Sequence, residues 1–230
     1  MKKKRIHAIV LARGGSKGIK NKNIVIVNKK PLIYWSIKNS LKSKLIDKTW
    51  VSSDNDKILK IAKRFGANII KRPKDISGDT SSSEKAWKHA ITEIKKNEKI
   101  DFVVGVQPTS PIRGAKDFDN ALLKFYKKKY DSLFSACDFE TFFTWKIKNG
   151  KPYPNYNIDN RLRRQKIQRS ILENGSFYIF KVSKFLKENN RLFGNKGFYI
   201  MEKFKSFQID KKNDLFLIET IFKNLPKKIK

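Results

Sequence analysis

The sequence predicts an α/β fold built on a single doubly wound, mainly parallel β-sheet with helices on both faces. Short apolar, β-rich runs alternate with longer segments whose apolar residues recur at helical spacing, which is typical of parallel strands joined by crossover helices. The chain has 230 residues, of which 39% are hydrophobic, and this is enough to bury the core of one sizeable domain. We therefore expect residues 1–230 to form a single domain.

The first half of the chain follows this alternation without interruption. The residues from Ile6 to Ala12 are almost all apolar, as expected of a strand buried on both faces. Pro31 suits the first turn of the next helix, where its missing N–H costs nothing, and Asp54 is expected to cap the helix after the second strand. The strands expected here are 6–12, 46–53, 68–70, 101–106 and 131–136, and the helices are 31–42, 56–65, 81–96 and 117–128.

The alternation stops after Cys137. Residues 138–170 are rich in aromatic and turn residues and then in arginine, and Asn149-Gly150 predicts a hairpin turn between strands at 144–147 and 153–156. We interpret 138–170 as an arm inserted into the domain. Beyond it, the pattern predicts strands at 175–180 and 207–210, a short helix between them, and a last amphipathic helix over 213–222.

The composition argues against several classes of protein. Lys and Arg number 53 against 21 Asp and Glu, a formal net charge of +32, while 12% of the residues are aromatic, so the chain is a folded domain with a basic surface. Because the lysines are scattered, we expect no nucleic-acid partner and favour a smaller polyanion. One cysteine and two histidines exclude an intrachain disulfide and disfavour histidine-built metal sites and triads.

Nothing in the sequence predicts a membrane segment. No apolar run approaches the ~18 residues that a spanning helix needs. The basic start followed by residues 6–12 resembles a signal peptide only superficially, because the run is short and continues into Arg13 and Lys17 without a small-residue cleavage site. The single thiol agrees with a cytoplasmic location, which we expect.

The loop after the first strand is a candidate phosphate site. In open α/β sheets, ligands bind beyond the carboxyl ends of the strands. Residues 12–23 combine three glycines, which let backbone N–H groups approach an anion, with Arg13, Lys17 and Lys22. The spacing matches neither a Walker A loop nor a dinucleotide-binding motif, so an ordinary solvated turn is the alternative.

Two further polar loops are expected at the same edge. One runs from Arg72 to the serines at 81–83, and serines at a helix start suit an anion or a ribose as well as a plain N-cap. The other, Gln107–Arg113, holds hydroxyls and a charge between two prolines. On a strand at 207–210, Gln208 and Asp210 would share one face. There the Asp210 carboxylate could hold Mg²⁺ against substrate phosphates or simply cap the last helix.

Together these motifs resemble the acylneuraminate cytidylyltransferases, that is, the CMP-sialic acid synthetases and their relatives for legionaminic, pseudaminic and Kdo-type sugars. The resemblance covers about Ile6 to Glu219 and implies a nucleotide-diphospho-sugar transferase-like fold, in which the arm at 138–170 is exchanged across a homodimer. The motifs that carry it are Ile9–Gly18 with Lys22-Asn23, Arg72-Pro73 with Asp79, Gln107–Arg113, Asn174–Tyr178 and Ile209-Asp210.

The resemblance implies a reaction in which CTP and a 2-keto-3-deoxy sugar acid give the CMP-sugar and pyrophosphate. Such a reaction needs neutralisation of the phosphate charges and in-line placement of the attacking anomeric hydroxyl. Catalytic roles fall to Arg13, Lys17 and Asp210, with Mg²⁺ held by Asp210. The residues implied for the nucleotide are Arg13, Lys22, Asn23, Arg72 and Ser83, and those for the sugar are Gln107, Arg164, Gln165, Asn174, Tyr178 and Phe193.

The chain departs from the family pattern at two positions. Gln208 replaces the first of two aspartates, so it offers Mg²⁺ only a neutral oxygen. Leu172 stands where an arginine usually precedes the Asn-Gly pair, which leaves Arg164 or Arg169 to take the sugar carboxylate or indicates a different sugar. The alternatives are a transferase for another nucleotide or sugar, and a catalytically impaired relative that binds nucleotide.

Overall fold

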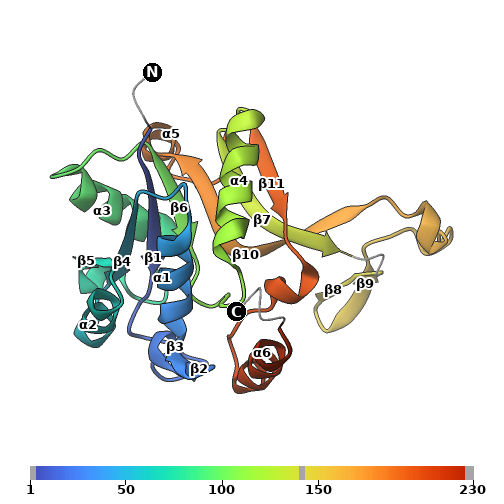
Figure 1. Cartoon of the computed structure of the whole chain (residues 1–230). Helices are drawn as coiled ribbons and strands as arrows, with labels where there is room; N and C mark the ends of the chain where they lie inside the picture. Colours follow the sequence, from blue (N-terminus) through green and yellow to red (C-terminus); the bar gives the residue numbers. More distant parts are fainter. Residues whose placement is uncertain (1–3, 140–142, 226–230) are drawn as a thin grey trace.

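The computed structural model describes residues 4–139 and 143–225 and contains a central seven-stranded sheet in the order β11-β7-β10-β6-β1-β4-β5 (Figure 1). Strand β10 pairs antiparallel with both neighbours, and the other pairs are parallel. The predicted mainly parallel α/β fold is therefore confirmed. The strands are β1 (Ile6–Leu11), β4 (Lys48–Ser53), β5 (Asn68–Lys71), β6 (Phe102–Val106), β7 (Ser132–Phe139), β10 (Ser170–Lys181) and β11 (Lys196–Ile200).

Helices cover both faces of the sheet because its strands are apolar on both sides. Ala8 and Val10 of β1 belong to the cluster that contains the apolar faces of α1 (Leu32–Lys42), α2 (Asp56–Arg64) and α4 (Ala115–Lys127), whereas Ile9 belongs to the cluster of α3 (Ser83–Lys95) and α5 (Val182–Glu188). In β6, Gly105 lies under the Trp87 ring, where a Cβ would come within 2.7 Å of the ring. This glycine lets α3 pack closely on the sheet.

The last helix, α6 (Lys212–Asn224), packs beside the small antiparallel pair β2 (Ile26–Val27) and β3 (Lys30–Pro31). Its residues Ile218 and Phe222 share an apolar cluster with Trp35 of α1 and with Ile209. Figure 1 shows α6 at the same end of the molecule as β2 and β3. None of the described helices is long and apolar enough to cross a membrane.

The structure differs from the sequence prediction at four places. The cap of α2 is Asn55, whose side chain accepts from the Ile58 N–H, and not Asp54. Residues 207–210 do not form a strand, because the buried Ile209 donates its N–H to the Thr109 carbonyl across a loop instead of joining the sheet. The edge beside β7 is taken by β11, which the pattern did not indicate, and β10 begins five residues before the expected strand at 175–180.

The arm contains the expected hairpin, formed by β8 (Trp145–Lys148) and β9 (Lys151–Pro154). Its turn residues Asn149 and Gly150 have φ values of 50° and 74°, the left-handed conformation that a two-residue hairpin turn requires. The hairpin projects away from the sheet (Figure 1). Part of the arm, residues 140–142, lies outside the described residues.

Candidate active site

A cavity of about 520 Å³ lies at the carboxyl ends of β1, β5 and β6. Its walls come from the loop after β1, the loop that joins β5 to α3 and the loop after β6, with Asp210 at one side. The prediction that three polar loops lie together at one edge of the sheet is confirmed. The sequence-predicted residues that line the cavity are Arg13, Lys17, Lys22, Asn23, Arg72, Ser83, Gln107 and Asp210.

The loop after β1 is held in place from three directions. The buried Asn23 donates its Nδ2 hydrogen to the Arg13 carbonyl at 2.9 Å, and the Gly14 N–H donates to Asp54 Oδ1 at 2.8 Å. A Cβ on Gly18 would lie 2.2 Å from the carbonyl oxygen of Asp210. Gly18 therefore permits a contact between the first loop and the C-terminal segment that no other residue would allow.

Three cations of this loop face carboxylates. Arg13 Nη1 lies 2.6 Å from Asp79 Oδ1, and Lys17 Nζ lies 2.9 Å from Asp79 Oδ2. Lys22 Nζ lies 2.8 Å from Asp210 Oδ1. The hydrogen bonds from Lys17 and Arg13 hold the pKa of Asp79 below its ordinary value. The cavity therefore concentrates positive charge at one end of β1 and balances part of it internally.

The second wall begins with a buried arginine. The Arg72 N–H donates to the Ser53 carbonyl, and Arg72 Nε donates to Ser77 Oγ at 3.0 Å. Burial lowers the pKa of Arg72, although the nearby Asp54 carboxylate opposes this effect. Helix α3 then starts at Ser83 with Ser82 as its N-cap, so the positive end of the helix dipole faces the cavity.

The third wall is fixed by Arg113, a residue to which sequence reasoning gave no role. Its fully buried guanidinium donates to the Ser110 carbonyl at 2.7 Å, to Ser176 Oγ at 3.1 Å and to Ser36 Oγ at 2.6 Å. Burial lowers the pKa of Arg113 to about 9. Gln107 also donates its N–H to the Ser176 carbonyl. The loop after β6 is thereby tied to β10 and α1.

Gln208 links the same loop to Asn174 through two hydrogen bonds. Thr109 Oγ1 donates to Gln208 Oε1 at 3.2 Å, and Gln208 Nε2 donates to the Asn174 carbonyl. The buried Asn174 side chain accepts from Ser135 and donates to Ser206. Asn174 is not among the cavity residues, so its predicted contact with a sugar has no support in this placement.

Tyr178 is not among the residues that line the cavity, and its side chain is held by Glu173 and Arg191. Its hydroxyl donates to Glu173 Oε1 at 2.6 Å, and the Arg191 guanidinium lies over the rings of both Tyr178 and Trp87. Arg191 Nε also donates to Glu84 in the first turn of α3 at 2.7 Å. Burial, with the Glu173 carboxylate, raises the pKa of Tyr178 to about 12, so its hydroxyl stays protonated at neutral pH.

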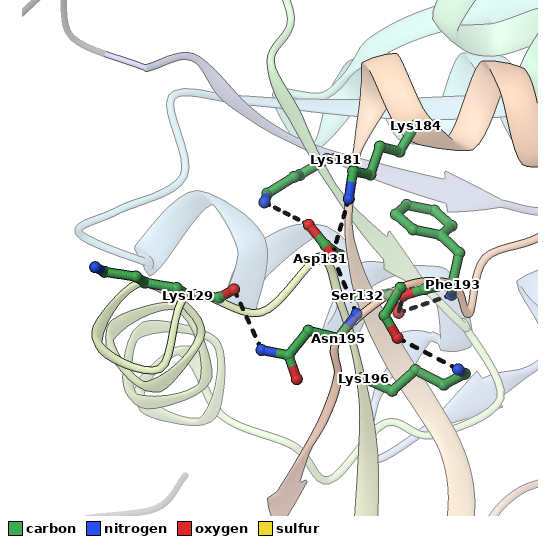
Figure 2. Close-up of polar contacts among 9 residues, drawn as sticks. Lys129, Asp131, Ser132, Lys181, Lys184, Phe193, Asn195 and Lys196 are labelled. Atoms are coloured by element: carbon green, nitrogen blue, oxygen red, sulfur yellow. Dashed lines mark hydrogen bonds and ion pairs between the residues drawn. The ribbon is translucent and has the colours of Figure 1, made fainter.

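Phe193 is buried in the apolar cluster that also contains Tyr178 and Trp87. Figure 2 shows it bonded to Ser132, the first residue of β7, whose Oγ donates to the Phe193 carbonyl and accepts from the Phe193 N–H. The neighbouring Asp131 is paired with Lys181 and Lys184. Because β7 runs in the same direction as β6, its first residue is remote from the cavity at the end of β6. Phe193 is not among the residues that line the cavity, so its contact with a sugar stays a prediction.

The remaining predicted sugar residues lie in the arm. Gln165 is exposed in a short 3₁₀ turn over Arg164–Lys166, and the side chain of Arg164 lies outside the described residues. Arg169, the other arginine considered for the sugar carboxylate, is paired with Asp138 through Nε and Nη2. Within this one chain, Gln165 and Arg169 are not among the residues that line the cavity.

The donor set limits the metals that the site can take. Among the described residues, no group of three or more His, Cys, Asp or Glu side chains is placed to hold an ion. Two carboxylates line the cavity beside the cationic loop: Asp79, which is paired with Arg13 and Lys17, and the more exposed Asp210, which is paired with Lys22. This fits Mg²⁺, which usually keeps several waters and uses one or two carboxylates together with substrate phosphates. Gln208 has both ends of its amide engaged by the protein.

The sheet order and the cationic cavity at the carboxyl ends of its strands define an α/β protein of the nucleotide-binding class. The comparisons narrow this class. The profile of the cytidylyltransferase family matches residues 7–227, and the chain therefore belongs to that family.

Relatives and solved structures agree with this assignment. The chain is 38% identical to an N-acylneuraminate cytidylyltransferase of Oncorhynchus mykiss over 77% of its own length and 41% of the relative. It is 29% identical to a pseudaminic acid cytidylyltransferase of Campylobacter jejuni over 94% of its length and 95% of the relative. A CMP:2-keto-3-deoxy-manno-octonic acid synthetase complexed with CTP has the same fold, with a TM-score of 0.69 at 13% identity over 95% and 98% of the two chains. The chain thus spans less than half of the Oncorhynchus relative and nearly all of the Campylobacter one.

Proposed function

We propose that this protein transfers CMP from CTP to the anomeric hydroxyl of a 2-keto-3-deoxy sugar acid and releases pyrophosphate. The observation that carries the proposal is the cavity at the end of β1, which Arg13, Lys17, Lys22 and Asp210 line together. Phosphoryl transfer is catalysed mainly by positioning and by stabilisation of negative charge, and this cluster supplies both kinds of group.

The nucleotide is expected to occupy the two walls after β1 and β5. Arg13, Lys17 and Lys22 bind its phosphates, since each presents a cationic nitrogen to the cavity. Arg72 and Ser83 hold the ribose and the base from the other wall, with Asn23 keeping the first loop in register. The anomeric hydroxyl attacks the α-phosphorus, the bond to the β-phosphate oxygen breaks, and pyrophosphate leaves.

Asp210 is the proposed Mg²⁺ ligand. When bound, Mg²⁺ supplies neutralisation of the phosphate charge and acidifies oxygens that it coordinates. Lys22, which now pairs with Asp210, would turn to a phosphate. Gln208 is proposed to stay with Asn174 and Thr109, so that Asp210 is the one protein carboxylate at the ion.

The sugar acid is expected to lie between Gln107 and the Tyr178 cluster. Gln107 is half-buried in the cavity wall next to Thr109. Leu172 is exposed on β10 and gives a carboxylate no partner, so the acid group needs an arginine from elsewhere. The relatives named for N-acylneuraminate and pseudaminic acid favour a nonulosonic acid as the substrate class.

A homodimer is part of the proposal, because the arm would then bring Arg164 and Gln165 to the partner's cavity. The arm exposes apolar side chains that a partner would cover: Trp145, Ile147 and Tyr153 are 46%, 81% and 49% exposed. Light scattering should give twice the mass of the chain, and a monomer at micromolar concentration would contradict this part. A cytoplasmic location, predicted from the single thiol, belongs to the same proposal.

The decisive experiment is pyrophosphate release with Mg²⁺. CTP, UTP, GTP and ATP are each combined with N-acetylneuraminate, diacetyllegionaminate, pseudaminate and Kdo. Release confined to CTP with one acid would support the proposal and identify the sugar. Release with another nucleotide would replace it by a different nucleotidyltransferase activity. If CTP neither reacts nor raises the melting temperature, the chain does not bind this nucleotide and the proposal is wrong.

A further inference from the structure

The strongest feature that the proposed reaction leaves unused is Asp79, a carboxylate inside the cavity. It pairs with Arg13 at 2.6 Å and with Lys17 at 2.9 Å, so one residue engages two of the cations assigned to the phosphates. A carboxylate in a site for a polyanion opposes binding unless it moves, because like charges repel over these distances. Its presence therefore needs an explanation.

The segment that carries Asp79 is anchored at both ends and spans from one wall to the other. On one side, Arg72 Nε donates to Ser77 Oγ, and Ser77 Oγ donates to the Pro73 carbonyl at 2.8 Å. On the other side, Ser82 caps α3 by accepting from the Lys85 N–H. Between these anchors, Asp79 contacts the first loop through its two ion pairs with Arg13 and Lys17.

The local geometry allows this segment to change partners. The Lys17 side chain is 80% exposed and that of Asp79 is 43% exposed, and a Cβ on Gly78 would meet nothing within 4 Å. Ion pairs between exposed side chains contribute little net stability. Phosphate groups, which bind arginine through charge-assisted hydrogen bonds, are therefore able to displace the Asp79 carboxylate.

We propose that Asp79 is an intramolecular counter-ion that competes with the β- and γ-phosphates for Arg13 and Lys17. It keeps the two cations in place before the nucleotide arrives, lowers the affinity for CTP, and returns to them as pyrophosphate leaves. This inference rests on the proposed function, because it assumes that Arg13 and Lys17 bind the phosphates. Asp79 is then a determinant of nucleotide affinity and of product release.

The test measures the binding of CTP, pyrophosphate and cytidine to Asp79→Asn and to the unaltered protein by titration calorimetry with Mg²⁺. Removing the competing charge should tighten CTP and pyrophosphate about three- to tenfold, while cytidine, which has no phosphate, should bind as before. Asp75→Asn is the matched control, since Asp75 is an exposed carboxylate four residues earlier in the same loop. The control should leave all three affinities within twofold.

Three results would overturn the inference: unchanged or weaker CTP binding in Asp79→Asn, equal tightening in Asp75→Asn, or equal tightening of cytidine. Asp79→Ser serves in place of Asp79→Asn if the latter does not fold. Arg13→Ala in the same assay separates the two proposals. If it weakens CTP while Asp79→Asn has no effect, the phosphate site stands and the counter-ion is rejected. If it leaves CTP binding unchanged, the phosphate assignment itself fails.

Discussion

The walls of the cavity differ in how their polar groups are satisfied. The loop after β1 presents three cations, the exposed Lys17 and the half-buried Arg13 and Lys22, whose partners are carboxylates at 2.6–2.9 Å. The loop after β6 is backed by the fully buried Arg113 and by Gln208, both of which form hydrogen bonds with other parts of the protein. One wall can exchange its partners for those of a ligand, and the other cannot without breaking buried hydrogen bonds.

This difference indicates a division of labour. Exposed ion pairs contribute little to stability and rearrange at small cost, so the first wall is suited to capture and release of phosphates. Buried hydrogen bonds are costly to leave unmade, so the third wall is suited to holding a reacting group in one position. The predictions below test whether the two walls differ in this way.

The largest effect is expected from removing Arg113, the buried charge behind the loop after β6, which we call the rigid wall. Arg113→Ala deletes the donors to Ser110, Ser176 and Ser36 and should lower the free energy of unfolding by about 3 kcal/mol or more. Urea denaturation followed by tryptophan fluorescence measures the change. Arg64→Ala, at the exposed C-terminal end of α2, is the control. A loss below about 1 kcal/mol would show that the third wall is no more rigid than the first.

The next effect concerns Asp210, the carboxylate that pairs with Lys22 of the loop after β1. Asp210→Ala should lower kcat about 100-fold while changing CTP affinity much less, because the charge that it helps to neutralise develops during the reaction. Steady-state kinetics and calorimetry with CTP give the two numbers. Asp138→Asn removes an exposed carboxylate paired with Arg169 in the arm and controls for loss of charge. Equal losses in kcat and in CTP affinity would contradict the assigned role.

A smaller effect is expected where the two walls meet. Gln208→Asp restores a carboxylate but loses the donor to the Asn174 carbonyl, so stability should fall by about 1 kcal/mol. If Gln208 belongs to the rigid wall, the Mg²⁺ concentration needed for half-maximal activity should change less than threefold. A large fall in that concentration, or activity that appears only in the variant, would show that the natural chain lacks a working metal site.

The two walls also differ in how far the sequence predicts them. In the loop after β1, charged residues stand next to glycines, and this combination can be seen in a short stretch of sequence. Arg13, Lys17 and Lys22 can therefore be identified from the loop alone. Arg113 was visible only as a charge in a polar loop, because its role depends on Ser36 and Ser176, which are distant in sequence. Asp79 was noted only as part of a motif, and its partners follow from the approach of two loops.

The sheet could be predicted because it, too, is indicated by a local pattern in the sequence. Apolar periodicity is a local signal that fixes most strands and helices, and the errors occur where tertiary contacts decide. Residues 207–210 have strand-like alternation, yet Ile209 is buried in the cluster of α6 and its N–H pairs with Thr109. No strand was predicted at 196–200, yet this segment pairs with β7 as β11. The chain path through these segments is set by long-range packing, which no local pattern contains.

The smallest effect separates the stability of the fold from the charge of either wall. Trp50 Nε1 donates to Nδ1 of the buried His7 at 3.1 Å, and burial lowers the pKa of His7 below its ordinary value. The unfolded chain then binds a proton below about pH 6.5 that the folded chain does not, so stability is lost as the pH falls through this range.

Between pH 7 and pH 5, Arg113 and Asp79 of the cavity walls do not change their charge, because the pKa of Arg113 is about 9 and that of Asp79 is lowered. His7→Gln, which keeps an acceptor for Trp50, should flatten the pH dependence of urea denaturation over this interval without altering CTP affinity. If the slope survives in this variant, the proton is bound elsewhere, and a parallel loss of CTP affinity would tie it to the cavity.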